Sequence, residues 1–567
     1  MTRRIVRTLI QLSAALVFGI IVVLFLDRNY RVLPVAIHNH LPSHHPGSVI
    51  VDVEVAKCSK INFLSNCELE GDGWTRLDKE LYLGLAWSES YMYIKRKHEE
   101  DLTSEDKVVI DIKIGRLDAN VQAPTPKGTW EPRSHGIWLL RSDKKISSDS
   151  GDAITAIDVL FGDDAVEVRD NWEIRAMPLI MSRTKKQHSV HVTVRRGMPA
   201  EHKVPKLKIP KGGKFKILQV ADLHLSTGVG ACREPVPAKL NGVDCQADPR
   251  TLDFVNQMIL DEKPDFVVLS GDQVNGESSP DTQSAMFKII ALLKEHKLPW
   301  AAIFGNHDDS PQGLSREAQM EIMETLPYSM ATAGPADVDG VGNYVIEVGA
   351  ESGADHSAIT MYFLDTHAYS PDERHYPGYG WIKPSQIEWF KKTAQGLKKK
   401  HQEYSLTHLD ISFIHIPLTE YTNWTTGPWV GQWREGVTAP KYNSGFRDAL
   451  VEQGVVMVSA GHDHANDYCL LSPEGEGDKR VPALWMCYAG GVGLGGYGGY
   501  KDYVRRVRVF EINPSLGSIV TWKRMEYGEK GRIDEHMMVQ GGRALPPPAP
   551  PPTAEPTKAV PPPPPPP

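Results

Sequence analysis

The chain has no excess of basic residues, and this limits the partners it can have. Among 567 residues, 63 lysines and arginines stand against 71 acidic side chains, which gives a formal net charge of −8. No overall positive field of the kind that binds nucleic acid is therefore expected. The hydrophobic fraction of 41% excludes a wholly disordered chain, and the length predicts more than one folded domain.

Cysteine is also scarce, and no C-x-x-C pair is present to suggest a zinc knuckle. The six cysteines fall into three local pairs, which are Cys58 with Cys67, Cys232 with Cys245, and Cys469 with Cys487. This spacing predicts three disulfides formed in an oxidising compartment. Six unpaired buried thiols are the alternative interpretation.

The amino terminus contains an uncharged, mostly apolar run. Three arginines lie within residues 1–7, the run covers residues 8–26, and Asp27 ends it. As a helix, at about 1.5 Å per residue, this run would nearly match the thickness of a bilayer core. A small-x-small cleavage site is missing, so the pattern predicts a single-pass signal anchor rather than a removable signal. The rest of the chain would then be lumenal or extracellular, in the secretory pathway or vacuole, although a catalytic domain facing the cytosol stays open.

Two further signals bear on this location. Asn423-Trp424-Thr425 is an N-glycosylation sequon, which weakly favours a lumenal glycoprotein. Proline is concentrated at the other end of the chain, where 14 of the 42 prolines lie in the last 22 residues. Residues 544–567 are therefore predicted to be a disordered tail that favours polyproline II. Such a tail could bind an SH3 or WW domain only if it faced the cytosol.

Between these ends the sequence texture predicts two domains. Residues 27–48 are expected to be a stalk, and residues 49–205 a β-rich, sandwich-like domain with no motif that carries chemistry. Residues 211–530 alternate strands with helices, which predicts an α/β domain. The strands expected in the β-rich domain are Val49–Val55, Leu81–Trp87, Val108–Ile114, Trp138–Leu140, Ala153–Leu160 and Val190–Val194.

Polar residues directly follow five of the apolar strands expected in the α/β domain. The blocks are Asp222-Leu223-His224, Gly271-Asp272, Gly305-Asn306-His307, His415, and Gly461-His462-Asp463-His464. In α/β sheets, sites assemble beyond the carboxyl ends of strands, so these five ends can meet in one crevice. Nitrogen and oxygen ligands without a thiolate suit iron, manganese or zinc. Each residue alone could be a turn former or a satisfied core histidine, but the joint pattern favours a metal site.

This constellation resembles the calcineurin-like metallophosphoesterase superfamily, whose blocks D-x-H, G-D, G-N-H, H and G-H-x-H occur here in the same order over residues 214–526. The resemblance implies an αββα sandwich with a binuclear metal site. It implies that Asp222, His224 and His464 bind one metal ion, that Asn306, His415 and His462 bind the other, and that Asp272 bridges them. It also implies that His307 faces the substrate and assists the leaving group.

Such a site would hydrolyse a phosphoric ester directly, with a metal-bound hydroxide as the nucleophile. The metal pair could be divalent or of mixed valence, drawn from iron, manganese and zinc. Purple acid phosphatases in the superfamily place a tyrosine three residues after the bridging aspartate. Here that position is Asn275, so a non-purple site is expected.

Longer stretches sharpen the resemblance, including Gly271–Gly276, Gly378-Tyr379-Gly380-Trp381-Ile382 and Gly493–Gly498. They are similar to fungal dosage-dependent cell-cycle regulator phosphatases and to plant purple-acid-phosphatase-like proteins. For the fungal proteins this implies a phosphoprotein phosphatase with a role in the cell cycle.

Two matters stay open in the sequence. The glycine-rich run Gly490–Tyr500 either approaches a phosphate with its backbone amides and tyrosines or is a hairpin loop. It is not a nucleotide-binding P-loop, because no G-K-[ST] follows it. The expected activity is that of a phosphomonoesterase, with a phosphodiesterase of the same fold as the alternative. A membrane-bound interaction protein with an idle metal site is the further alternative.

Overall fold

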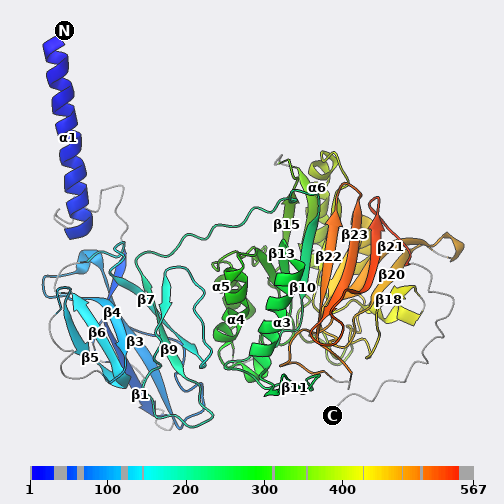
Figure 1. Cartoon of the computed structure of the whole chain (residues 1–567), viewed down its shortest axis with the longest axis horizontal. Helices are drawn as coiled ribbons and strands as arrows, with labels where there is room; N and C mark the ends of the chain where they lie inside the picture. Colours follow the sequence, from blue (N-terminus) through cyan, green and yellow to red (C-terminus); the bar gives the residue numbers. More distant parts are fainter. Residues whose placement is uncertain are drawn as a thin grey trace. The chain divides into compact units, whose positions relative to one another are not determined.

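The computed structural model describes residues 3–30, 47–59, 69, 71–116, 125–142, 146–309, 313–352, 356–425, 427–475, 477–498 and 502–547. The chain divides into two compact units, Met1–Glu201 and His202–Pro567. The boundary falls close to residues 205–211, where the sequence texture changes. Figure 1 shows the elements of both units with their labels.

The predicted amino-terminal anchor is a helix in the structure, α1 (Arg3–Tyr30). Across the residues that the structure describes, however, no helix has both the length and the apolar character needed to cross a membrane. The transmembrane segment predicted over residues 8–26 therefore stays a prediction that this structure does not support. Most of the predicted stalk and of the proline-rich tail lies outside the described residues.

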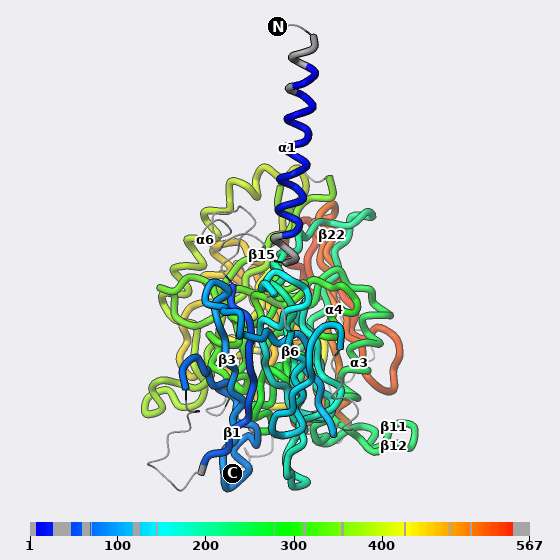
Figure 2. The backbone as a smooth tube through the Cα atoms, turned by 90° about the vertical axis from the view of Figure 1, so that its left-hand side faces the viewer, coloured from blue at the N-terminus to red at the C-terminus, as the bar shows by residue number. Residues whose placement is uncertain are grey.

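The first unit is built from three antiparallel sheets of three strands each, in the orders β1-β3-β2, β4-β6-β5 and β7-β9-β8. Figure 2 shows β1 and β3 running side by side, as their long antiparallel register requires. The strands are β1 (Ser48–Ser59), β2 (Trp74–Arg76), β3 (Ser88–His98), β4 (Val108–Ile114), β5 (Thr129–Pro132), β6 (Ile137–Ser142), β7 (Ile154–Phe161), β8 (Trp172–Ile174) and β9 (Val190–Arg196).

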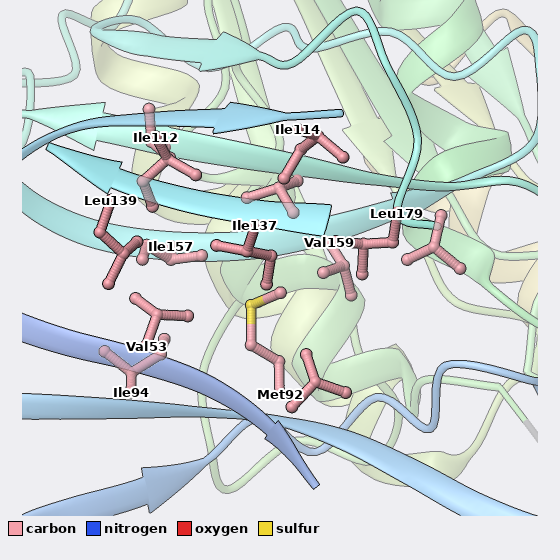
Figure 3. Packing of buried hydrophobic residues seen from close by; sticks show 14 of the residues in the cluster. Val53, Met92, Ile94, Ile112, Ile114, Ile137, Leu139, Ile157, Val159 and Leu179 are labelled. Atoms are coloured by element: carbon pink, nitrogen blue, oxygen red, sulfur yellow. The ribbon is translucent and has the colours of Figure 1, made fainter. Parts of the chain in front are cut away.

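One apolar core joins these sheets. Val53, Met92 and Ile94 of β1 and β3 face Ile112 of β4 and Ile157 of β7 across it (Figure 3). Side chains from both layers therefore bury one another, as in a sandwich. The β-rich character predicted for residues 49–205 is confirmed.

One predicted strand of this unit, Leu81–Trp87, is wrong. Leu83 has a left-handed backbone with φ 51°, and Gly84 follows it with φ 77°. The Glu80 carboxylate accepts hydrogen bonds from the amides of Tyr82 and Gly84, at 3.0 and 2.7 Å. These local bonds favour a turn over an extended chain, and the strand begins only at Ser88.

The second unit contains two seven-stranded mixed sheets. The first has the order β14 (Trp300–Ile303), β13 (Phe266–Ser270), β10 (Phe215–Val220), β22 (Arg506–Asn513), β23 (Ser518–Met525), β24 (Ile533–Gln540) and β25 (Arg543–Ala544). The second has the order β15 (Tyr344–Gly349), β16 (Ser357–Phe363), β17 (Leu409–Phe413), β19 (Met457–Ala460), β21 (Val481–Tyr488), β20 (Cys469–Glu474) and β18 (Trp429–Val430). A small hairpin pairs β11 (Lys239–Leu240) with β12 (Val243–Asp244).

Helices cover the outer faces of these two sheets. Helices α3 (Ala247–Glu262), α4 (Thr282–Glu295) and α5 (Arg316–Met323) lie beside the β10 sheet in Figure 1. Helices α6 (Pro384–Gln402) and α7 (Phe446–Gln453) bury Phe390 and Phe446 against the second sheet, in a core that includes Tyr362 and Met486. The unit is the expected α/β fold. Its first sheet continues through β24 and β25, beyond residue 530, where the predicted domain ended.

The parallel strands of both sheets place the site. Strands β10, β13 and β14 pair in parallel in the first sheet, and β16, β17, β19 and β21 do so in the second. The five strands predicted to precede the polar blocks are therefore all present and parallel to a neighbour. Their carboxyl ends carry the polar residues described next.

Candidate metal centre

The seven side chains that the sequence singled out as ligands are all buried, and six of them lie in two overlapping groups. Each side chain follows the carboxyl end of β10, β13, β14, β17 or β19. Six of them form the groups Asp222, His224, Asp272 and His464, and Asp272, His415 and His462. Within each group, one potential ligand atom per residue lies within 4.8 Å of every other. The side chain shared by both groups is Asp272, the residue expected to bridge.

In the first group, two imidazoles face each other. The Nε2 atoms of His224 and His464 are 3.0 Å apart. The carboxylate of Asp272 lies 3.6 Å from His224 Nε2. The Nδ1–H of His464 donates to the Tyr497 carbonyl at 2.8 Å, so its Nε2 carries the lone pair. A lone pair aimed at a second imidazole nitrogen is the arrangement that a shared cation would stabilise.

In the second group, buried polar atoms lack hydrogen-bond partners. Asn306 Oδ1 and His462 Nε2 are buried without any, and His415 Nε2 has only Asp272 Oδ2 at 3.3 Å. The Nδ1–H of His415 donates to the Ser270 carbonyl at 2.9 Å, which directs Nε2 into the cluster. Leaving such atoms unsatisfied costs about 1–3 kcal/mol each. This donor set of amide oxygen, imidazole nitrogen and carboxylate fits a metal ion.

Burial and neighbouring charges shift the pKa values of the two groups in different directions. Burial lowers the pKa of His224 and of His462 to about 3, so both imidazoles are neutral. Burial also opposes ionisation of Asp272, but His415 and other imidazoles beside it hold the pKa of that carboxyl well below its usual range. Burial lowers the pKa of His415 as well, yet Asp272 overrides this and raises it to about 9. His224 and His462 are thus already in the neutral form that binds a metal, whereas His415 is protonated at neutral pH in the metal-free chain and has to lose its Nε2 proton when it binds one.

The backbone bends sharply where it delivers these side chains. Asp222, His224, Asp272 and His462 all have left-handed conformations, with φ of 56°, 46°, 50° and 76°. For residues other than glycine this region costs about 1–3 kcal/mol each, and such strain is typical of functional sites. A Cβ on Gly305 would lie 2.1 Å from Asp272 Oδ1, so the glycine before Asn306 makes room for the candidate bridging carboxylate.

The turns are held by a residue that the sequence analysis did not single out. The buried Asp308 accepts hydrogen bonds from the amides of Asp272, Val274 and Gly305, at 2.9, 3.0 and 2.7 Å. Burial raises the pKa of Asp308 to about 6. Its carboxylate thus ties the β13 turn to the β14 turn. The only sequence signal was its position two residues after Asn306.

His307 lies at the edge of the groups and joins neither of them. Its backbone amide donates to Asp272 Oδ1 at 2.8 Å, and its ring lies 5.1 Å from the His224 ring. The side chain is half-buried. Asn275 occupies the position at which purple acid phosphatases have the tyrosine ligand. It is buried, and its backbone N–H donates to the Leu225 carbonyl at 2.9 Å.

The glycine-rich run packs directly on the first group. A Cβ on Gly496 would lie 2.5 Å from His464 Cε1 and 2.6 Å from His224 Cδ2. The Tyr497 ring stacks on the His464 ring at 3.9 Å, and its hydroxyl donates to Glu435 Oε2 at 3.1 Å. Close approach to the histidines therefore accounts for glycine here, and neither interpretation of the run anticipated this contact.

The disulfide prediction is confirmed for the pairs that the structure describes. Cys232 bonds to Cys245 and Cys469 to Cys487, and there is no free cysteine among the described residues. Cys58 is disulfide-bonded as well. Its expected partner, Cys67, lies outside the described residues.

Comparison with known proteins also indicates a phosphoesterase. The family model described as calcineurin-like phosphoesterase matches residues 215–466. Phosphatase DCR2 of Saccharomyces cerevisiae is 35% identical over 489 residues, which cover 83% of this chain and 79% of that protein. "Probable inactive purple acid phosphatase 14" of Arabidopsis thaliana is 33% identical, over 59% of this chain and 86% of that protein. A solved dimetal phosphatase from Danio rerio covers 57% of this chain and 99% of its own, at 12% identity and a TM-score of 0.38.

Proposed function

Since the chain belongs to the calcineurin-like phosphoesterases, we propose that it is a phosphomonoesterase whose catalytic centre holds two metal ions. One observation carries this proposal. Asn306 Oδ1 and His462 Nε2 are buried without hydrogen-bond partners among the described residues, His462 groups with Asp272 and His415, and Asp272 also groups with the facing nitrogens of His224 and His464. Two overlapping clusters that share one carboxylate are what a bridged metal pair requires.

The proposed roles follow the two groups. Asp222, His224 and His464 would hold one ion, Asn306, His415 and His462 the other, and Asp272 would bind both. When bound, such a pair lowers the pKa of a water molecule and neutralises the charge of the phosphoryl oxygens. His307 stands beside the cluster, where it could give a proton or a hydrogen bond to the leaving oxygen.

The substrate class we propose is a phosphate monoester, including the phosphorylated side chains of proteins. A phosphodiesterase of the same fold is the second candidate, and the ligand set serves both. The disulfides support a location in the secretory pathway, because such bonds form and persist in an oxidising compartment. The metals are proposed to be iron, manganese or zinc, because the ligands are nitrogen and oxygen atoms.

The test is a substitution at the shared carboxylate. Asp272→Asn is expected to remove activity toward monoesters and to lower bound metal from two ions per chain, because the amide offers neither the charge nor two anionic oxygens. Metal content is measured by elemental analysis, and activity with a panel of monoesters, diesters and phosphopeptides after reconstitution with each metal. Asp253→Asn, at an exposed aspartate of α3, is the matched control and should change neither quantity.

Two results would contradict the proposal. The first is turnover in Asp272→Asn close to that of the native chain. The second is a native chain that binds two metals and hydrolyses diesters but no monoester, which would favour the phosphodiesterase.

A further inference from the structure

One exposed aromatic segment lies against the candidate metal centre without a role in it. Residues 368–380, here called the tongue, leave the carboxyl end of β16 and return toward α6. Its two arms pair through the Ser370 amide with the Gly378 carbonyl at 2.8 Å and the Gly380 amide with the Ala368 carbonyl at 3.1 Å. Between these bonds, Tyr369 and Tyr379 form an antiparallel bridge.

The base of the tongue is fixed to the scaffold of the metal site. Asp365, just before it, accepts hydrogen bonds from Arg316 Nη1 at 2.5 Å and from the His367 amide at 2.8 Å. Arg316 also donates to the Gly305 carbonyl at 2.7 Å, in the turn that presents Asn306. The tongue and the ligand turn therefore share one buried arginine, so the tongue is positioned relative to the metals and is not a free loop.

The tongue presents a row of rings that leads out from the metal site. The Tyr379 ring meets the ring of His462, a proposed ligand, edge to face at 4.3 Å and 88°. On its other side, Tyr379 stacks with Tyr369 at 5.9 Å and 18°. Tyr379 is half-buried, whereas 61% of Tyr369 is exposed. Tyr369 therefore exposes much of its ring to solvent, next to a tyrosine that contacts a proposed ligand, and an exposed ring can stack on another planar ring.

We infer that Tyr369 and Tyr379 select phosphate monoesters whose ester oxygen is carried by an aromatic ring, such as phosphotyrosine in a protein. This inference rests on the proposed function. A phosphoryl group at the metals would place its substituent beyond His462, along Tyr379 and against the open face of Tyr369. A planar ring there gains an offset stacking contact, which a short alkyl chain such as that of phosphoserine cannot make.

The test compares two peptides of one sequence that carry either phosphotyrosine or phosphoserine. The full chain, reconstituted with Mn²⁺, is assayed for kcat and KM as the native form, Tyr369→Ala and Tyr369→Phe. Tyr369→Ala is expected to lower kcat/KM for the phosphotyrosine peptide by roughly two- to tenfold, through KM, with less than a twofold change for phosphoserine. Tyr369→Phe keeps the ring and should keep the native values.

A control variant and the contradicting results distinguish the stacking role of Tyr369 from the proposed phosphomonoesterase function. Tyr527→Ala, which removes a 45% exposed tyrosine from the loop after β23, should affect neither peptide. Equal losses on both peptides in Tyr369→Ala, or no loss on either, would overturn the stacking role and leave the proposed function standing. If the metal-loaded native chain hydrolysed neither peptide but cleaved other monoesters, this inference alone would be overturned; if it cleaved no monoester at all, the proposed function would be overturned with it.

Discussion

Asp308 shows how a residue outside the proposed ligand set can control the metal site. Three backbone amides donate to its carboxylate, and two of them belong to Asp272 and to Gly305, the residue before Asn306. Two of the turns that deliver candidate ligands are therefore held by a single side chain. Supporting residues of this kind typically change metal affinity 10- to 100-fold when they are replaced.

Asp308→Asn should therefore weaken metal binding and stability together. The amide group has only one acceptor oxygen for three donors, so at least one buried N–H loses its partner. We expect a loss of about 1–3 kcal/mol in the free energy of unfolding and a tenfold or larger rise in the metal concentration needed for half-maximal activity. Metal titrations followed by activity, and denaturant unfolding of the metal-free chain, measure the two effects.

Asp309→Asn is the matched control for this change. Asp309 is the next residue, and its carboxylate, 31% exposed, pairs with Arg316 at 3.0 Å. Partly exposed pairs contribute little, so stability and metal affinity should stay near the native values. Equal effects of the two substitutions would argue against a special role for Asp308.

The identity of the candidate ligands could be read from sequence, but the residues that position them could not. Asp222, Asp272 and His462 each follow an apolar strand closely, and this relation is local along the chain. The role of Asp308 depends on the convergence of two turns, in which Asp308 bonds to Asp272 across 36 residues of sequence, and that of Tyr379 depends on a ring contact with His462. Neither contact leaves a periodic or spacing signal in the sequence.

At the scale of elements, strands with continuous apolar runs were predictable and those with mixed composition were not. Phe266–Ser270 is buried throughout, and it is one of the apolar runs directly before a polar block, Gly271-Asp272, from which a strand was predicted. By contrast, β24 (Ile533–Gln540) alternates exposed and buried positions irregularly, near the edge of its sheet, and was missed. The Leu81–Trp87 segment has strand-like composition, but the hydrogen bonds of Glu80 turn the chain.

The glycine-rich run is the element most closely fitted to the site, and Gly496→Ala tests that fit. The added methyl group would lie 2.5–2.6 Å from ring atoms of His464 and His224, so both imidazoles would have to move. Because productive geometry tolerates only about half an ångström, we expect at least a tenfold loss of affinity for one of the two metal ions. Metal content and activity at limiting metal measure it.

Gly396→Ala serves as the control for this substitution. Gly396 lies within α6 with open space where a Cβ would be. Alanine there should raise stability by about 0.5–1 kcal/mol and leave the metal content unchanged. If Gly496→Ala bound both ions as tightly as Gly396→Ala, the close fit of the loop to the histidines would have no functional meaning.

At the scale of the whole catalytic unit, polar groups cross between the two sheets. Trp485 of β21 donates from Nε1 to the Met538 carbonyl of β24 at 2.8 Å, and its ring packs 5.3 Å from the ring of His536. Lys523 of β23 pairs with Asp467, next to β20, at 2.6 Å. A group buried at this interface that gains a charge is kept from water, so the new charge destabilises the packing of both sheets.

His536 should make the joint between the sheets sensitive to acid. Its side chain is 6% exposed, its Nδ1–H donates to the Asp534 carbonyl at 2.9 Å, and its Nε2 is buried without a partner. Burial lowers the pKa of His536 from 6.5 to about 4. Between these two pH values His536 is protonated in the unfolded chain but neutral in the folded chain. The free energy of unfolding therefore has its full value above pH 6.5 and falls as the pH drops toward 4. The loss corresponds to roughly 3 kcal/mol.

His536→Gln removes this titration and isolates it from all others. Hydrogen exchange of the β23 and β24 amides, measured by mass spectrometry on the metal-free chain, reports local opening of the joint. At each pH the native chain is compared with the variant, so the intrinsic exchange rate and the titration of the metal ligands cancel. Protection in the native chain should fall more steeply between pH 6.5 and 4 than in His536→Gln. Parallel profiles would show that His536 has the same pKa in the folded and the open state, so that the two sheets join without an acid-sensitive group at this position.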